Sequence, residues 1–107
     1  MTARALINVP AKARRGEIIA IKTLIAHPME TGYRVGLNGA LIPRDIITLF
    51  RCTYNGEEIF RADFSRAIAA NPYLTFFTVA TATGMIEFEW TGDNGFSATE
   101  QAPITVE

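Results

Sequence analysis

Apolar and polar residues alternate along much of this chain with a period of two, the spacing of β-strands. The longest alternating stretch covers residues 17–27, and one of its faces carries Ile19, Ile21, Thr23 and Ile25. Pro28 has no N–H to donate to a sheet and holds the preceding residue extended, so regular pairing should end near His27. The pattern predicts a central strand that leads directly into the one histidine of the chain.

Shorter apolar stretches predict six further strands, at residues 4–9, 46–54, 57–64, 73–83, 85–91 and 96–106. Asn55-Gly56 suits a two-residue type I′ turn, and Asp93-Asn94-Gly95 predicts a second hairpin turn. Residues 65–72 allow at most a short helical piece before Pro72. Seven strands without a long helix predict one all-β domain over residues 1–107, an immunoglobulin-like antiparallel β-sandwich.

Residues 29–45 lose the alternation and collect glycines, so they predict a long loop with a small hairpin around Asn38-Gly39. Two strands also carry large apolar residues on both faces, at residues 46–50 and 74–79. A sandwich strand has only one inner face, so this surplus either forms an exposed partner surface or is covered by the loop. The sequence leaves both alternatives open.

Composition excludes several classes of function. Ten basic and eleven acidic residues leave a net charge of −1, which provides no field to attract nucleic acid or an anionic membrane. No apolar stretch is long enough for a spanning helix, and no segment has the pattern of a signal peptide. We therefore expect neither nucleic acid nor a membrane as a partner.

The single cysteine and single histidine limit the available chemistry. They cannot complete a disulfide, a blue-copper site or a zinc site, so we expect no metal and no cofactor. Cys52 lies within a β-pattern and is expected in the core, and the carboxylates do not cluster for acid–base work. We expect no catalytic residue; an enzyme that used Cys52 and His27 would instead show rapid alkylation of the folded thiol.

The segment from His27 to Gly32 is the best local candidate for function. It offers an imidazole, a flexible thioether and a carboxylate at one strand end, which suits a hydrogen-bond switch or an adaptable contact. A turn in which His27 merely satisfies a backbone group explains the same residues. A stand-alone binding module that holds a small ligand with the loops near His27 is therefore one candidate function, and a protein that binds a partner through exposed apolar surface is the other.

Several segments together carry a resemblance to a known family. They are Ile18 to Lys22, Thr23 to Gly32, Leu41-Ile42-Pro43-Arg44, Cys52 to Glu57, Ala70 to Leu74 and Phe88-Glu89-Trp90-Thr91. Over nearly its whole length the chain resembles the SoxZ family, the small subunit of the sulfur carrier complex in the bacterial thiosulfate-oxidising Sox system. The resemblance implies an immunoglobulin-like fold and a SoxY-type partner, whose C-terminal Gly-Gly-Cys-Gly-Gly arm carries sulfur intermediates covalently.

The resemblance also implies a role and a location. This chain ends in Ile104 to Glu107 without such an arm, so it is expected to be the non-catalytic subunit that stabilises the carrier and contacts other Sox enzymes transiently. It is expected in the periplasm, exported bound to a signal-bearing partner, and the isolated chain could form homo-oligomers. The residues expected to contact the partner or its arm are His27, Pro28, Met29, Glu30, Asn71, Pro72 and Tyr73. Those expected at the subunit interface are Ile47, Leu49 and Phe77.

Overall fold

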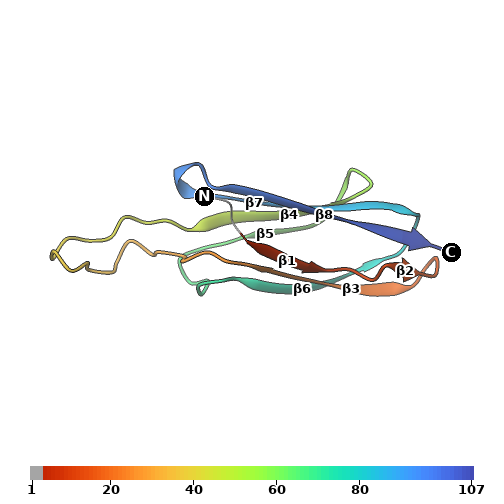
Figure 1. Cartoon of the computed structure of the whole chain (residues 1–107), viewed down its shortest axis with the longest axis horizontal. Coiled ribbons are helices and arrows are strands. Elements are labelled where there is room, and N and C mark those ends of the chain that lie inside the picture. Colours follow the sequence, from red (N-terminus) through yellow and green to blue (C-terminus); the bar gives the residue numbers. More distant parts are fainter. Residues whose placement is uncertain (1–3) are drawn as a thin grey trace.

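The structure, a computed structural model, describes residues 4–107 and consists of two β-sheets packed face to face (Figure 1). The three-stranded sheet has the order β1 (Ala5–Asn8), β3 (Ile18–Ile25), β6 (Tyr73–Val79). The five-stranded sheet has the order β2 (Lys12–Ala13), β8 (Ser97–Val106), β7 (Gly84–Gly92), β4 (Ile47–Tyr54), β5 (Glu57–Asp63). The predicted all-β sandwich is confirmed, and β2, a two-residue strand parallel to β8, is the one strand that the alternation did not predict.

The core lies between the sheets and is built by the predicted alternation. On β3 the residues Ile19, Ile21, Thr23 and Ile25 are all buried, and β3 is the middle strand of its sheet as expected. Phe50 on β4 packs against Trp90 on β7 and against Phe76 on β6, with ring centroids 5.2 and 5.9 Å apart. Phe60 on β5 stacks on Phe76 of β6 with 4.2 Å between ring centroids. Because β5 and β6 are edge strands of different sheets, this aromatic pair joins the two sheets along one edge of the sandwich. The sandwich is therefore held together by interdigitated large side chains.

The two predicted hairpin turns are present. Asn55 and Gly56 have φ angles of 50° and 84°, as a type I′ turn between β4 and β5 requires. A short 3-10 turn, η1 (Asp93–Gly95), joins β7 to β8. Residues 64–72 cross from β5 to β6 without a helix.

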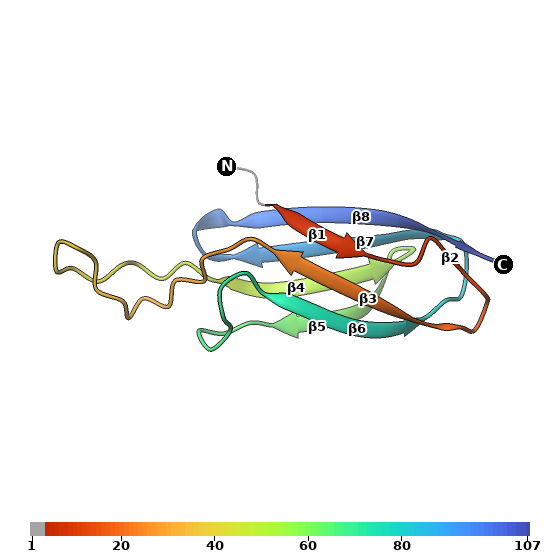
Figure 2. The same ribbon diagram turned by 60° about the horizontal axis from the view of Figure 1, so that its bottom comes forward.

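Residues 29–45 form an arm that projects from one end of the sandwich along its long axis (Figure 1). The two sides of the arm are joined by backbone hydrogen bonds between Glu30 and Asp45, at 2.9 and 2.8 Å, and from Ile42 N–H to the Arg34 carbonyl, at 2.8 Å. Its turn lies at residues 36–40, where the small hairpin was predicted. The arm points away from both sheets, so it does not fold back over the apolar surplus (Figure 2).

Candidate partner-binding site

Figure 2 shows the three-stranded sheet from its outer side. This outer face is apolar, although it faces solvent. Phe76 points into the core, so alternation directs Tyr73, Phe77 and Val79 outward. Phe77 is 66% exposed and lies opposite Ala20, while Val79 lies opposite Ile18. We call this surface the apolar face; its members are Leu6, Ile18, Ala20, Leu24, Tyr73, Phe77 and Val79. Lys22, opposite Thr75, places a charge among them on the middle strand.

Two shallow depressions mark one end of the apolar face. A depression of about 290 Å³ is lined by residues that include Leu6, Lys22 and Tyr73. A second, of about 200 Å³, lies against Leu6, Ala26 and Asn71. Both depressions are bordered by Leu6 and Leu24, so this end of the face offers recesses for the side chains of another molecule.

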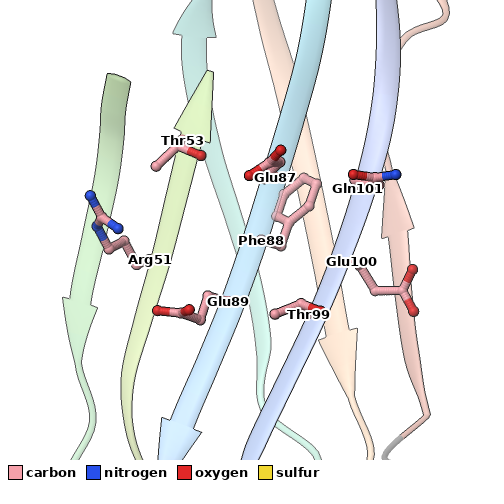
Figure 3. Close-up of a pocket in the computed structure, with 8 residues that line it drawn as sticks. All are labelled: Arg51, Thr53, Glu87, Phe88, Glu89, Thr99, Glu100 and Gln101. Carbon is pink, nitrogen blue, oxygen red and sulfur yellow. The ribbon is translucent and has the colours of Figure 1, made fainter. Parts of the chain in front are cut away.

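The outer face of the five-stranded sheet has the opposite character. A depression of about 550 Å³ there is lined by β4, β7 and β8 residues, namely Arg51, Thr53, Glu87, Phe88, Glu89, Thr99, Glu100 and Gln101 (Figure 3). Nearby, Glu58 accepts hydrogen bonds from Arg51 at 2.7 Å and from Arg61 at 3.1 Å. Within residues 4–107 no three His, Cys, Asp or Glu side chains are grouped so that they could hold a metal ion. This surface has the composition of an ordinary solvated sheet face.

The three predicted interface residues do not share a surface. Ile47 is the first residue of β4, and it is fully buried in the core. Leu49 alternates with the buried Phe50 and so lies, half-buried, on the outer side of the five-stranded sheet. Phe77 alone lies on the apolar face. The sequence showed that both strands carry surplus apolar residues, but it could not show that the two surpluses lie on opposite sides of the sandwich.

His27 follows β3 and is held in a tight network that we call the histidine turn. The backbone N–H of His27 donates to the side-chain Oδ1 of Asn71 at 3.0 Å, and the backbone carbonyl of His27 accepts the backbone N–H of Asn71 at 2.8 Å. The Met29 N–H donates to His27 Nδ1 at 2.9 Å, and Phe96 packs against the imidazole with 4.7 Å between ring centroids. Met29 and Asn71 have φ angles of 51° and 53°, so the turn uses two non-glycine residues in the left-handed region. These bonds fix where the arm leaves the sandwich.

The same bonds determine the protonation state of His27. Because Nδ1 accepts a hydrogen bond from Met29, the proton of the neutral ring lies on Nε2, which is 3.8 Å from Asp45 Oδ1. Burial lowers the pKa of His27, and the nearby carboxylates of Asp45 and Asp93 oppose that shift without cancelling it. The imidazole is therefore neutral at neutral pH, and the His27 side chain is only 3% exposed.

The seven predicted loop residues divide into two groups. His27, Met29 and Pro72 are buried, and the Met29 Sδ accepts the Ile47 N–H at 3.3 Å. Pro28, Asn71 and Tyr73 are exposed, and Glu30 is half-buried beside Arg34, whose hydrogen bond lowers the pKa of Glu30. The side chains of the first group are enclosed in the protein, and those of the second group are accessible from outside it.

Several surface residues were missed by the sequence-based prediction. Leu6 and Ile18 belong to the apolar face, and each lies on the outward side of its strand, but neither was among the predicted interface residues. At the base of the arm, Arg66 donates to the Tyr33 hydroxyl at 2.6 Å and lies 4.7 Å from its ring centroid. No local pattern could have paired two residues of separate loops.

Cys52 is placed as predicted. It is fully buried on β4, opposite Phe88 of β7 and Phe60 of β5. Burial raises the pKa of its thiol to about 12. A thiol in this environment stays protonated and is a poor nucleophile.

Comparison with known families identifies the chain. The family model described as "Sulphur oxidation protein SoxZ" matches residues 7–103. The chain belongs to the SoxZ family. This confirms the resemblance seen in the sequence and places the chain in a family of sulfur-oxidation proteins. No curated protein sequence matches it significantly.

Solved structures support the fold of this SoxZ family member. A superoxide reductase (neelaredoxin) from Ignicoccus hospitalis superposes with a TM-score of 0.74 and 16% identity, covering 100% of this chain and 81% of the other. The sulfur carrier protein SoxY from Chlorobium limicola f thiosulfatophilum gives a TM-score of 0.65 and 11% identity, covering 96% and 78%. A CARDB domain from Pyrococcus furiosus gives 0.54 and 17%, covering 98% and 94%. At these identities the likeness concerns the sandwich fold alone.

The described residues also include no helix that is long and apolar enough to cross a membrane.

Proposed function

We propose that this chain is the non-catalytic subunit of a sulfur carrier heterodimer and that it binds a SoxY-type subunit through the apolar face. The observation that carries the proposal is the exposure of Leu6, Ile18, Tyr73 and Phe77 on one sheet of a member of the SoxZ family. Contiguous apolar surface of this kind is typical of a protein interface, because its burial against a partner removes it from water.

The residues around the base of the arm extend this surface. Tyr73 belongs to the apolar face and follows Asn71 and Pro72 in the loop that the histidine turn holds. We propose that the side chains that reach the surface there, those of Pro28, Asn71 and Tyr73 and of the half-buried Glu30, contact the partner or its carrier arm. His27 and Met29 would act through them as positioning residues, because both are buried.

The side-chain chemistry of the chain favours the role of a non-catalytic partner subunit. Its one thiol, Cys52, is enclosed in the core with a raised pKa, so a covalent sulfur intermediate would be carried by the partner. The family relation further supports a periplasmic location, export in complex with the signal-bearing partner, and transient contacts with other Sox enzymes. In isolation, the apolar face would favour self-association.

Co-expression with the SoxY-type protein of the same genome tests the proposal. Size-exclusion chromatography with light scattering should give the mass of a stable one-to-one complex. Phe77→Glu should dissociate it by placing a charge in the apolar face, whereas Thr99→Glu, on the outer side of the other sheet, should leave it intact. Separate elution of the two wild-type proteins at micromolar concentration would refute the proposed function.

A further inference from the structure

The four edge strands of the sandwich differ in how they are protected against pairing with another chain. β1 and β2 are only four and two residues long. β5 is seven residues long and carries Glu57, Glu58, Arg61 and Asp63. β6 is equally long, but its sequence Tyr-Leu-Thr-Phe-Phe-Thr-Val has no charge and no proline. Long uncharged edges are templates for another strand, and natural proteins normally block them with charges, bulges or prolines.

Hydrogen bonds at the two ends of β6 show which of its backbone groups are free. The Pro72 carbonyl accepts the Ile25 N–H at 3.2 Å, and the Ala80 N–H donates to the Glu17 carbonyl at 2.8 Å. Even-numbered residues therefore direct their backbone groups toward β3. In an antiparallel ladder the intervening residues direct theirs to the other side. Tyr73, Thr75, Phe77 and Val79 thus present their N–H and C=O groups at the open edge, where no strand of residues 4–107 pairs with β6.

The same four residues also present their side chains on the outer side of the sheet, where Tyr73, Phe77 and Val79 belong to the apolar face. A strand laid along β6 would satisfy their backbone groups, and its own outward side chains would continue the apolar face. On the core side, β6 is held in place because its Phe76 stacks on Phe60 of β5. The open edge and the apolar face are therefore continuous and form one surface.

We propose that β6 is a docking edge at which the SoxY-type subunit adds one of its own strands and extends the three-stranded sheet to four. This inference rests on the proposed function and specifies how the partner is held. The occupant is assigned from the uncharged edge, its continuity with the proposed interface, and the sandwich fold of the Chlorobium SoxY, which supplies strands of the required kind. Strand addition combines backbone hydrogen bonds, which give affinity, with outward side chains, which give specificity. A second copy of this chain is the competing occupant.

Thr75→Pro tests the docking edge with little expected effect on the fold. The Thr75 N–H points to the open edge, so proline there removes no hydrogen bond to β3, and edge strands tolerate proline. Thr75→Ala keeps the N–H and is the matched control. We expect Thr75→Pro to weaken binding of the SoxY-type subunit by about tenfold or more, since a hydrogen bond is lost and the ring obstructs the approaching strand. Thr75→Ala should stay within about threefold of the wild type.

Hydrogen exchange of the wild-type proteins provides a second measurement that does not depend on a variant. In the complex, the amides of Thr75, Phe77 and Val79 should become protected, because they would enter a new ladder. If the wild-type complex forms while these amides exchange unchanged and Thr75→Pro binds like Thr75→Ala, the docking edge is refuted and the proposed function stands. If no wild-type complex forms, both fall. Protection of these amides in a homodimer of the isolated chain, but not in the complex, would assign the edge to a second copy and overturn the proposal.

Discussion

Replacing Phe77 with alanine should separate binding from folding. The side chain lies on the apolar face and is 66% exposed in the isolated chain, so most of its surface is available to a partner. Its neighbour across the ladder is Ala20, whose side chain is a single methyl group. We therefore expect the substitution to reduce the free energy of unfolding by about 1 kcal/mol or less, in keeping with surface substitutions on strands.

The effect on binding can be worked from the exposed area. A phenylalanine side chain buries about 200 Å² when fully enclosed, so the exposed two thirds correspond to about 130 Å². At about 25 cal/mol per Å², complete burial against a partner contributes about 3 kcal/mol. Allowing for incomplete burial, we expect Phe77→Ala to cost about 2–3 kcal/mol of binding free energy, which raises Kd by about 30- to 150-fold.

Isothermal titration calorimetry against the SoxY-type subunit measures this loss, and urea unfolding of each variant measures stability. Thr99→Ala, on the outer side of the five-stranded sheet, is the control for location and should leave Kd unchanged. A Kd within about threefold of the wild type for Phe77→Ala would contradict the assignment of the apolar face. So would an equal loss for Thr99→Ala, because binding would then involve both sides of the sandwich.

Three further predictions concern the histidine turn, the core thiol and a hairpin. Burial lowers the pKa of His27 in the folded chain below its usual 6.5, so as pH falls the unfolded chain takes up a proton on this residue before the folded chain does. The contribution of the neutral His27 to the free energy of unfolding should therefore be complete above pH 6.5 and should be lost as pH falls toward the pKa of the folded state. Urea unfolding measured from about pH 7.5 down to about pH 5.5 should show this slope in the wild type and not in His27→Asn, whose Oδ1 can replace Nδ1 as acceptor. Cys52 should react with a thiol reagent only after denaturation, since its pKa is raised to about 12, and rapid labelling of the folded chain would contradict its burial. Gly56→Ala should lower the free energy of unfolding by about 1–2 kcal/mol, because Gly56 has a φ of 84°, and an unchanged thermal midpoint would argue against the type I′ turn.

The fold was largely predictable because the alternation is a local property. Ile86, Phe88 and Trp90 alternate with Glu87 and Glu89 along β7, and the structure buries the first set and exposes the second. The Asn55-Gly56 turn was predictable for the same reason, since its two positive φ angles depend only on those two residues. β2 was missed because two residues are too few to show a period, and its pairing with β8 joins distant parts of the chain.

The candidate site was less predictable because it depends on which strands become neighbours. Ile47, Leu49 and Phe77 are similar in sequence context, yet the structure places them in the core and on two opposite faces. The histidine turn was located by its residue types, but its bonds to Asn71, 44 positions away, follow only from the antiparallel pairing of β3 with β6. Burial of His27 and Met29 could not be read from a loop segment rich in polar residues.

The arm has a consequence for how this chain can vary. Its base is fixed by Met29 in the core and by the ion pair of Arg44 with Asp93 at 2.7 Å, but its tip contributes no buried side chain. Leu37 is fully exposed, and Val35 and Leu41 are also exposed. Substitutions at the tip therefore carry almost no folding penalty, whereas substitutions in β3 or β7 disturb the core. The stability of the fold therefore places little constraint on the residues of the tip, and a constraint on them has to come from contacts that the tip makes with other molecules.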